Sequence, residues 1–470
     1  MATNHGPRGD DDPDERSRIV IGIDAGTSAI KSVAFALDGT VRGEARREVP
    51  VLRDRAGRSE TDMEGLWRLA VETLREALAA LGDGVEIVAI GVTGQGDGAW
   101  LVDAEGRPTG PAALWNDARS AGVVEEWEGS ARGEAVRETT GSPLHPGALP
   151  AIWEAMRRTG TIPGTAAHHL NCKDWLRYRL VGEIATDPSD ASRTCLDVTL
   201  GEYSAGLAEA LGQEDLARIL PAVLPSDAVA GALQPDARRA IGVDAAIPVA
   251  VGAFDAVACG IGLGAISDGD AYVVLGTTAM VTVNQPSAAS RRHADSILLR
   301  TGRGEQVAEC LAQMSGMPNL SWARATLGLE ELGWDEIEQR LRLLDREHSG
   351  DAAAGVLFLP YTSPSGERAP FRDVHASGGW VGADVTASSL TLLRAVYTGL
   401  AHSVAESMLE MGIGDAGDPE AAPDAGPGSG SITVGGGGAQ SRLLCELLAD
   451  VTGRTVIRRV DAEIGARGAA

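Results

Sequence analysis

At 470 residues the chain is longer than one hydrophobic core usually serves, so two domains are expected. Its 44% hydrophobic and 23% charged residues are typical of a soluble globular protein, and its net charge of −25 argues against nucleic acid or an anionic membrane as a partner. An anionic substrate would need a local basic pocket, whereas a neutral sugar would not.

The five cysteines are scattered and never have Cys-x-x-Cys spacing. This pattern predicts reduced thiols in a cytoplasmic protein, without a zinc site or a disulfide framework. Residues 1–17 are polar and lack an apolar segment, which indicates a disordered leader and not a signal peptide. No uninterrupted apolar run approaches the roughly 20 residues that a membrane span requires.

The first predicted strand contains Asp24, breaks at the turn Gly26–Ser28 and resumes as a second apolar run, Ser32–Leu37. Glycine lets the backbone approach a ligand, and the N–H groups and hydroxyls of such a turn suit phosphate oxygens. Lys31, one of only two lysines in the chain, follows this turn, where a compact ammonium group would serve a phosphate. An ordinary hairpin with a lysine placed by chance is the alternative.

Two later strands of the first half end in polar loops. The strand Val85–Val92 leads into Thr93–Gly98, where glycines alternate with polar residues as in ligand-binding loops. The strand Pro248–Val251 leads to Asp255, which opens a helix, and open α/β sheets bind ligands at such positions. A simple helix N-cap is the alternative for Asp255. The other helices predicted in this half are Met63–Leu81, one opened by Leu114–Arg119, Lys173–Leu180 and Ser204–Leu220.

The second half begins with a related pattern, Val273–Thr278, followed by the apolar run Ala279–Val283. Two such hairpins favour a nucleotide clamped between two related lobes. Near the end, the strand Ile432–Val434, the glycine run Gly435–Ala439 and the helix Ser441–Val451 suit an adenosine diphosphate, because backbone N–H groups and the helix dipole face it. Neither a Walker A loop nor a dinucleotide fingerprint stands at these turns. The other predicted elements are helices Met317–Leu327, Trp334–Arg346 and Ser388–Met411, strand Gly355–Leu359 and a flexible insertion, Gly412–Ser431.

In this order the motifs resemble those of the FGGY carbohydrate kinases, a branch of the actin–hexokinase ATPase superfamily. The resemblance runs from about residue 18 to residue 470. It implies an α/β fold of two ribonuclease-H-like domains around a cleft, with residues 18–254 as the sugar-binding N-terminal domain and 255–470 as the C-terminal domain. ATP and Mg²⁺ are the implied cofactors, a small sugar or polyol is the implied partner, and a homodimer is compatible with the family.

The chain departs from the family pattern in three places. Trp153 follows Pro150–Ile152 in the sequence. The family usually has a Lys three residues before this Trp, at the position that is Pro150 here. Thr398 stands where an acidic residue is common, and the sequence ends at Ala470, where the family continues into a further helix. A truncated C-terminus, with reduced stability or activity, is therefore expected, because six residues cannot sustain an isolated helix.

The resemblance also implies roles for single residues. Asp255 would accept the proton of the attacking hydroxyl, and Asp24 together with Asp255 would hold Mg²⁺. The implied phosphate-binding residues are Gly26, Thr27, Ser28, Lys31, Gly276, Thr277 and Thr278. The implied adenosine-binding residues are Gly436, Gly437, Gly438 and Ala439. The implied substrate-binding residues are Gln95, Asp97, Trp115, Asp117 and His145.

The implied reaction is ATP-dependent phosphorylation of a primary hydroxyl of a small sugar or polyol. Thr93–Leu101 and Asn171–Trp175 are most similar to erythritol kinases, and Trp115–Arg119 is also similar to xylulose kinases. Erythritol is thus the first expectation, and xylulose or another pentulose is the rival. An actin-like or chaperone-like ATPase shares the hairpins but has no use for a pocket at Gln95 and Asp97. A non-catalytic nucleotide- or sugar-binding protein is a further alternative.

Overall fold

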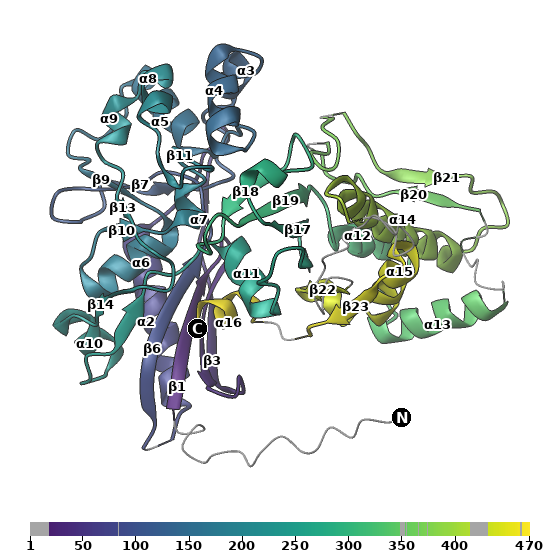
Figure 1. The fold of residues 1–470 in the computed structure, drawn as a ribbon. Coiled ribbons are helices and arrows are strands. Elements are labelled where there is room, and N and C mark those ends of the chain that lie inside the picture. Colours follow the sequence, from purple (N-terminus) through teal and green to yellow (C-terminus); the bar gives the residue numbers. More distant parts are fainter. Residues whose placement is uncertain are drawn as a thin grey trace.

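Two lobes, each built on a six-stranded mixed sheet, make up the computed structural model (Figure 1). The structure describes residues 18–82, 84–347, 353, 355–364, 366–373, 375–413, 431–460 and 463–470. The predicted leader and residues 414–430 of the predicted insertion lie outside these ranges. The expected α/β fold of two domains is confirmed.

Strand order is similar in the two large sheets, each of which places an antiparallel hairpin beside parallel strands. The N-terminal sheet runs β14 (Val229–Ala232), β15 (Pro248–Ala250), β6 (Glu86–Gly94), β1 (Arg18–Ala25), β2 (Ala29–Ala36) and β3 (Val41–Glu48). The C-terminal sheet runs β18 (Ile297–Arg300), β19 (Val307–Gln313), β17 (Ala279–Gln285), β16 (Ala271–Leu275), β22 (Ser431–Gly435) and β23 (Thr455–Arg458). Both predicted glycine turns therefore join the first two strands of their lobes, β1 to β2 and β16 to β17.

Shorter strands and helices surround these sheets. The small sheets contain β4 (Leu52–Arg53), β5 (Ser59–Thr61), β7 (Trp100–Val102), β8 (Ala112–Ala113), β9 (His168–Leu170), β10 (Ala185–Thr186), β11 (Leu196–Asp197), β12 (Glu202–Tyr203), β13 (Ala222–Val223), β20 (Leu357–Leu359) and β21 (Gly379–Val381). The N-terminal lobe carries α2 (Met63–Ala79), α3 (Ala121–Trp127), α4 (Ala131–Thr140), α5 (Leu149–Thr159), α6 (Cys172–Val181), α7 (Pro188–Ala191), α8 (Ala205–Leu211), α9 (Glu214–Ala217) and α10 (Pro235–Ile241). The remaining helices are α11 (Asp255–Leu263), η1 (Ala288–Ser290), α12 (Pro318–Thr326), α13 (Trp334–Glu347), α14 (Ser389–Glu410), η2 (Gly437–Gln440), α15 (Arg442–Thr452) and α16 (Ile464–Ala469).

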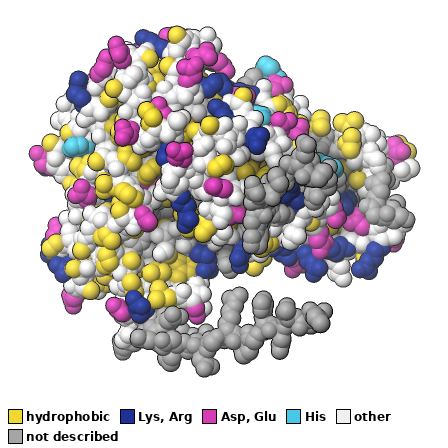
Figure 2. Space-filling model, viewed as in Figure 1, with side chains coloured by type: hydrophobic (Ala, Val, Ile, Leu, Met, Phe, Trp, Pro, Cys, Tyr) yellow, Lys and Arg dark blue, Asp and Glu magenta, His cyan; other side chains and the backbone are white. Residues whose placement is uncertain are grey.

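Apolar side chains at helical spacing explain the longer helices. On α2, Met63, Leu66, Ala70 and Leu74 are buried and pack with Ile21 in the core of the N-terminal lobe. The predicted helices Met63–Leu81, Lys173–Leu180, Met317–Leu327, Trp334–Arg346, Ser388–Met411 and Ser441–Val451 are confirmed, with ends that differ by at most two residues. Among the described residues no helix is long and apolar enough to cross a membrane. Figure 2 shows acidic and basic side chains interspersed over the visible face.

Two helix predictions in the N-terminal lobe were wrong. The single helix Ser204–Leu220 is instead two short helices, α8 and α9, because Gly212 adopts a left-handed conformation (φ 64°) and ends α8. Leu114–Arg119 does not open a helix. Asp117 accepts hydrogen bonds from the backbone of Ser59 and Arg119, which holds this segment as a loop until α3 begins at Ala121.

The short helix α16 lies with α11 between the two lobes (Figure 1). Its backbone packs directly on Gly22 of β1, Gly91 of β6 and Gly262 of α11, where an added Cβ would overlap backbone atoms of α16. These contacts explain why six residues form a helix here although an isolated helix of that length would not be stable. Because these three glycines have no side chain, α16 can approach the sheet and α11 this closely.

Replacing Gly22 by Ala tests this packing. The new methyl group would overlap the carbonyl of Ala466, so the backbone of α16 must move. We expect the free energy of unfolding, measured by chemical denaturation, to fall by about 2–3 kcal/mol. Gly122→Ala is the control, because no atom lies within 4 Å of its new Cβ on α3, and it should raise stability by about 0.5–1 kcal/mol. Equal effects of the two changes would contradict the packing account.

Candidate active site

A cavity of about 440 Å³ lies between the lobes and is lined by residues of both. It brings together many residues that the sequence predicted for one site. The predicted residues that line it are Asp24, Gly26, Gln95, Asp97, Trp115, His145, Asp255, Gly276 and Thr278. Those outside its lining are Thr27, Ser28, Lys31, Asp117, Thr277, Gly436, Gly437, Gly438 and Ala439.

Two carboxylates, Asp24 near the end of β1 and Asp255 at the start of α11, face this cavity. Burial raises the pKa of Asp24 to about 6, with Lys31 opposing the rise and Glu463 adding to it. Burial also raises the pKa of Asp255 to about 7, with further contributions from the charges of Asp24 and Asp97. A carboxyl with a pKa near neutrality can exchange a proton under ordinary conditions, which is the property a general base needs.

The same two carboxylates fit a divalent cation, because a positive charge between them would relieve the repulsion that raises the Asp255 pKa. Within the described part of the chain, no group of three or more His, Cys, Asp or Glu residues could hold a metal ion. A cation bound by Asp24 and Asp255 would therefore take most of its ligands from water and from a bound phosphate. Mg²⁺ is commonly held in this way.

Lys31 contacts the C-terminal segment. Its Nζ atom lies 2.9 Å from Oε2 of Glu463, just before α16. Lys31 is also the residue directly opposite Asp24 in the antiparallel pairing of β1 and β2. Its ammonium group therefore partly balances Asp24 and Glu463, and its predicted contact with a phosphate stays a prediction.

Trp115 and Gln95 of the cavity lining are linked by a chain of hydrogen bonds through Thr27. Trp115 Nε1 donates a hydrogen bond to Thr27 Oγ1 (2.8 Å), and Thr27 Oγ1 donates to Gln95 Oε1 (2.9 Å). Because the Gln95 carbonyl oxygen is used in this way, its Nε2 donor is left buried without a protein partner. Such a donor in a cavity wall suits a ligand hydroxyl.

Asp97 offers the complementary acceptor. Its Oδ2 atom lies 3.3 Å from both Arg193 Nε and His145 Nε2, whereas Oδ1 is buried without a partner. Burial alone would raise the pKa of Asp97, but Arg193 and His145 outweigh it and hold the pKa below its usual value. Asp97 is also the one non-glycine residue with positive φ (56°) in the described ranges, a strained conformation that often accompanies a functional site.

Asp117 is placed elsewhere. It is fully buried, its Oδ2 accepts from the Ser59 backbone N–H at 2.7 Å, and its Oδ1 accepts from Arg119 Nε at 2.8 Å. Arg119 Nη2 also lies 2.5 Å from Oε1 of Glu60. Both oxygens of Asp117 are thus engaged in closing the loop before α3, and its predicted contact with substrate stays untested.

Arg193 was missed by the sequence reading. It lines the cavity beside Asp97, but the surrounding segment Thr186–Thr194 was interpreted as an ordinary loop with favourable turn residues. Arg193 lies 96 positions from Asp97 in the chain, and arginine is too common here for its type to be a signal. Only the folded structure shows that Arg193 lies beside Asp97.

The turn between β16 and β17 and the glycine run after β22 lie at the carboxyl ends of two neighbouring parallel strands of the C-terminal sheet. Gly276 N–H donates to the carbonyl of Thr278 at 2.9 Å and closes the turn between β16 and β17. Strand β22 runs parallel to β16 with Gly435 opposite Val274, so their carboxyl ends are adjacent. Gly436 has a positive φ of 79°, and an added Cβ there would press on the carbonyl of Leu275. The run therefore passes close to the second turn.

Comparison with known proteins was made with both sequence and structure. The N-terminal and C-terminal domain models of the FGGY family of carbohydrate kinases match residues 19–262 and 271–470. The chain is 29% identical to an erythritol kinase of Brucella abortus, over 97% of this chain and 87% of that protein. It is 31% identical to a xylulose kinase of Escherichia coli, over 96% of this chain and 88% of that protein.

Solved structures show the same fold. A gluconate kinase from Lactobacillus acidophilus superposes with a TM-score of 0.82 at 21% identity, covering 96% of this chain and 88% of that one. A xylulose kinase from Brucella ovis gives a TM-score of 0.80 at 28% identity, covering 96% and 89%. Both alignments span the two lobes.

The raised pKa of Asp255 predicts a change in thermal stability with pH. A carboxyl whose pKa is higher in the folded chain (about 7) than in the unfolded chain (near 3.8) destabilises the fold increasingly as pH rises through this interval. We expect Asp255→Asn to raise Tm by roughly 1–3 °C at pH 8, and this gain to disappear near pH 4. Scanning fluorimetry of the ligand-free protein measures both values.

The matched control is Asp268→Asn, the same chemical change at an exposed loop position that keeps the oxygen bonded by Gln306 Nε2. It should leave Tm nearly unchanged at either pH. A lower Tm for Asp255→Asn at pH 8 would show that the carboxylate stabilises the fold, contrary to this account.

Proposed function

Since the chain belongs to the FGGY family of carbohydrate kinases and is therefore a phosphotransferase, we propose that it transfers the γ-phosphoryl group of ATP to a primary hydroxyl of erythritol. The observation that carries this proposal is the pair of unpartnered polar atoms, Gln95 Nε2 and Asp97 Oδ1, in the same cavity as Asp255. One supplies a donor and the other an acceptor, as neighbouring hydroxyls of a polyol require.

Two of the three arginines that line the cavity are paired with carboxylates. Arg193 lies against Asp97, and Arg372 Nη1 lies 3.1 Å from Oε1 of Glu128. The third, Arg368, donates through Nε to the carbonyl of Ala312 at 2.7 Å. Pairing of Arg193 and Arg372 lowers the attraction of this wall for the carboxyl group of a sugar acid.

Gln95 Nε2 and Asp97 Oδ1 have no hydrogen-bond partner, whereas His145 Nε2 already lies 3.3 Å from Asp97 Oδ2. Erythritol is preferred because Thr93–Leu101 and Asn171–Trp175 are most similar to erythritol kinases. Xylulose or another pentulose is the rival substrate, since the curated xylulose kinase is about as similar to this chain as the erythritol kinase.

Asp255 is the proposed general base. An alcohol is a poor nucleophile, so its proton must pass to an acceptor as the new P–O bond forms, and the Asp255 pKa of about 7 suits this transfer. Asp24 and Asp255 would hold Mg²⁺, which neutralises phosphate charge when bound. The turns Gly26–Ser28 and Gly276–Thr278 would bind phosphates through backbone N–H groups, and Gly436–Ala439 would lie against the adenosine.

Trp115 and Thr27 would act at the substrate end. Thr27 is proposed to orient the Gln95 amide through its hydroxyl, because that bond leaves Nε2 directed to the ligand. Trp115, which lines the cavity and donates to the same hydroxyl, would pack on the carbon face of the polyol.

Replacing Asp255 by Asn should lower kcat by roughly 10²-fold or more, because the amide cannot accept the hydroxyl proton. Affinity for ADP, measured by calorimetry, should stay within about threefold, since the fold and the glycine turns are unchanged. Asp268→Asn is again the control and should keep wild-type turnover. Near-wild-type kcat in Asp255→Asn would refute the assignment of the base.

Replacing Asp97 by Ala should mainly weaken polyol binding. Loss of a buried, charge-assisted acceptor costs about 1.5–3 kcal/mol, so KM for the polyol should rise at least 10-fold. KM for ATP should change little, because the proposed adenosine-binding run Gly436–Ala439 belongs to the C-terminal lobe and lies outside the cavity lining that contains Asp97. An unchanged KM for the polyol would place the substrate elsewhere.

The substrate itself is tested by a coupled assay of ADP formation with erythritol, xylulose, ribulose, ribitol and glycerol. We expect the highest kcat/KM with erythritol. A higher value with xylulose or ribulose would replace erythritol by a pentulose. ADP formation that is independent of any acceptor would favour an actin-like ATPase, and binding without turnover would favour a non-catalytic protein.

A further inference from the structure

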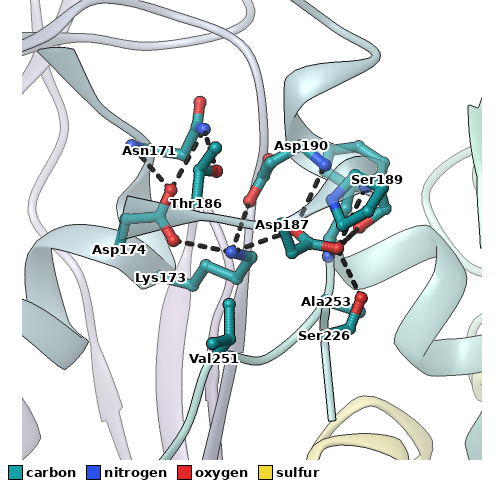
Figure 3. A network of polar contacts seen from close by, with 12 residues as sticks. Asn171, Lys173, Asp174, Thr186, Asp187, Ser189, Asp190, Ser226, Val251 and Ala253 are labelled. Atoms are coloured by element: carbon teal, nitrogen blue, oxygen red, sulfur yellow. Dashed lines mark hydrogen bonds and ion pairs between the residues drawn. The ribbon is translucent and has the colours of Figure 1, made fainter. Parts of the chain in front are cut away.

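A buried cluster of charges lies in the N-terminal lobe (Figure 3). None of its members lines the cavity. Lys173 is fully buried, and its Nζ atom lies 2.6 Å from Asp174 Oδ1, 3.0 Å from Asp187 Oδ1 and 3.3 Å from Asp190 Oδ2. Arg177 adds a second cation, 3.2 Å from Asp174 Oδ1. Burying so many charges is expensive unless they fix a specific geometry.

This cluster reaches the segment that leads to Asp255. Asp187 Oδ2 accepts hydrogen bonds from Ser189 Oγ (2.6 Å) and Ser226 Oγ (2.8 Å). The same Ser189 Oγ accepts from the backbone N–H of Phe254 at 2.8 Å. A continuous path of short contacts therefore joins Lys173 to the residue immediately before Asp255.

Thr93 holds the other end of the same peptide group. Its Oγ1 donates to the carbonyl of Ala253 at 2.6 Å, so the C=O and the N–H of the peptide between Ala253 and Phe254 are both bonded to buried hydroxyls. Thr93 lies opposite Asp24 in the register of β1 and β6. Thr93 on β6 thus contacts both the strand that carries Asp24 and the peptide group that precedes Asp255.

The residues before this peptide are anchored as well. Arg177 Nη1 donates to the carbonyl of Val251 at 3.2 Å, and Gly252 N–H donates to the carbonyl of Ser226 at 2.8 Å. The whole connection from β15 to α11 is therefore fixed to the N-terminal lobe, which also carries Gln95 and Asp97. Asp255 keeps its position relative to the substrate end of the cavity.

We propose that Thr93 and Ser189 are positioning residues for phosphoryl transfer, which hold the peptide between Ala253 and Phe254 from both ends and so aim the Asp255 carboxylate. Lys173 supports them by fixing Asp187, the acceptor for the Ser189 hydroxyl. This inference depends on Asp255 being the base proposed above. A displacement of about 1 Å at a reacting group can cost on the order of 100-fold in rate, so loss of either hydroxyl should be visible in kcat.

Two matched pairs of variants test the proposal. Thr93→Val removes the hydroxyl with little change of shape, whereas Thr93→Ser keeps it. Ser189→Ala removes the link between Asp187 and Phe254, whereas Ser226→Ala removes a donor to the same Asp187 oxygen without touching Phe254. The measurements are kcat, KM for the polyol, KM for ATP and Tm.

We expect Thr93→Val and Ser189→Ala to lower kcat by about 10-fold or more while both KM values stay within about twofold. Thr93→Ser and Ser226→Ala should stay within about threefold of wild-type kcat. In an Asp255→Asn background, Thr93→Val should cause no further loss, because the group that it positions is already inactive.

The results distinguish a failure of the positioning role from a failure of the assignment of Asp255 as the base. Wild-type kcat in Thr93→Val and Ser189→Ala, with Asp255→Asn inactive, would overturn the positioning role and leave the base intact. Equal losses of kcat in all four single variants, in step with Tm, would also overturn it, since they would indicate general destabilisation. Wild-type turnover in Asp255→Asn itself would instead refute the base.

Discussion

The structure depends on keeping two half-buried like charges, Asp24 and Asp255, in the lining of one cavity. Each has a raised pKa, to about 6 and about 7, chiefly because burial disfavours the ionised form. The ligand-free fold therefore carries an electrostatic penalty that a bound cation or a proton relieves. A site of this kind suits a reaction that brings a metal–phosphate complex and moves a proton.

Two sets of contacts in the surrounding fold fix the positions of these carboxylates. On one side α16 packs its backbone on Gly22 and Gly91 of the N-terminal sheet and on Gly262 of α11, so that this sheet and α11 are joined through α16 without intervening side chains. On the other side the peptide before Asp255 is bonded at both ends, by Thr93 and Ser189. Close packing and a satisfied polar network thus fix the backbone on both sides of the two carboxylates.

Features with a local pattern could be predicted from the sequence. The two glycine turns, the strand-to-helix position of Asp255 and the glycine run after β22 follow from short runs of residues. The structure places Asp255 and residues of both turns around one cavity, and the glycine run lies outside its lining, next to the second turn. The helix break at Gly212 was missed because the apolar spacing continues across it, although the left-handed glycine ends the helix.

Features that depend on distant partners could not be predicted. Lys31 was predicted to contact a phosphate because it follows the first glycine turn and lysine is rare in this chain, and this stays a prediction. Its ion pair with Glu463 was not predicted, because Glu463 lies at the far end of the sequence. The partners of Arg193 and Ser189, namely Asp97 and Phe254, are also remote, so neither residue carried a signal. The hydrogen bonds that Asp117 accepts from Ser59 and Arg119 were not predicted either, and its contact with substrate, implied by the family resemblance, stays a prediction.

The central claim is that Asp24 and Asp255 form an electrostatically strained pair that a metal–nucleotide complex relieves. The most direct measurement is the increase in Tm caused by ADP with MgCl₂, compared between the wild-type protein and Asp24→Asn at pH 8. We expect a large increase for the wild type and a much smaller one for Asp24→Asn, whose ligand-free Tm should already be higher. An equal increase in both proteins would contradict the claim.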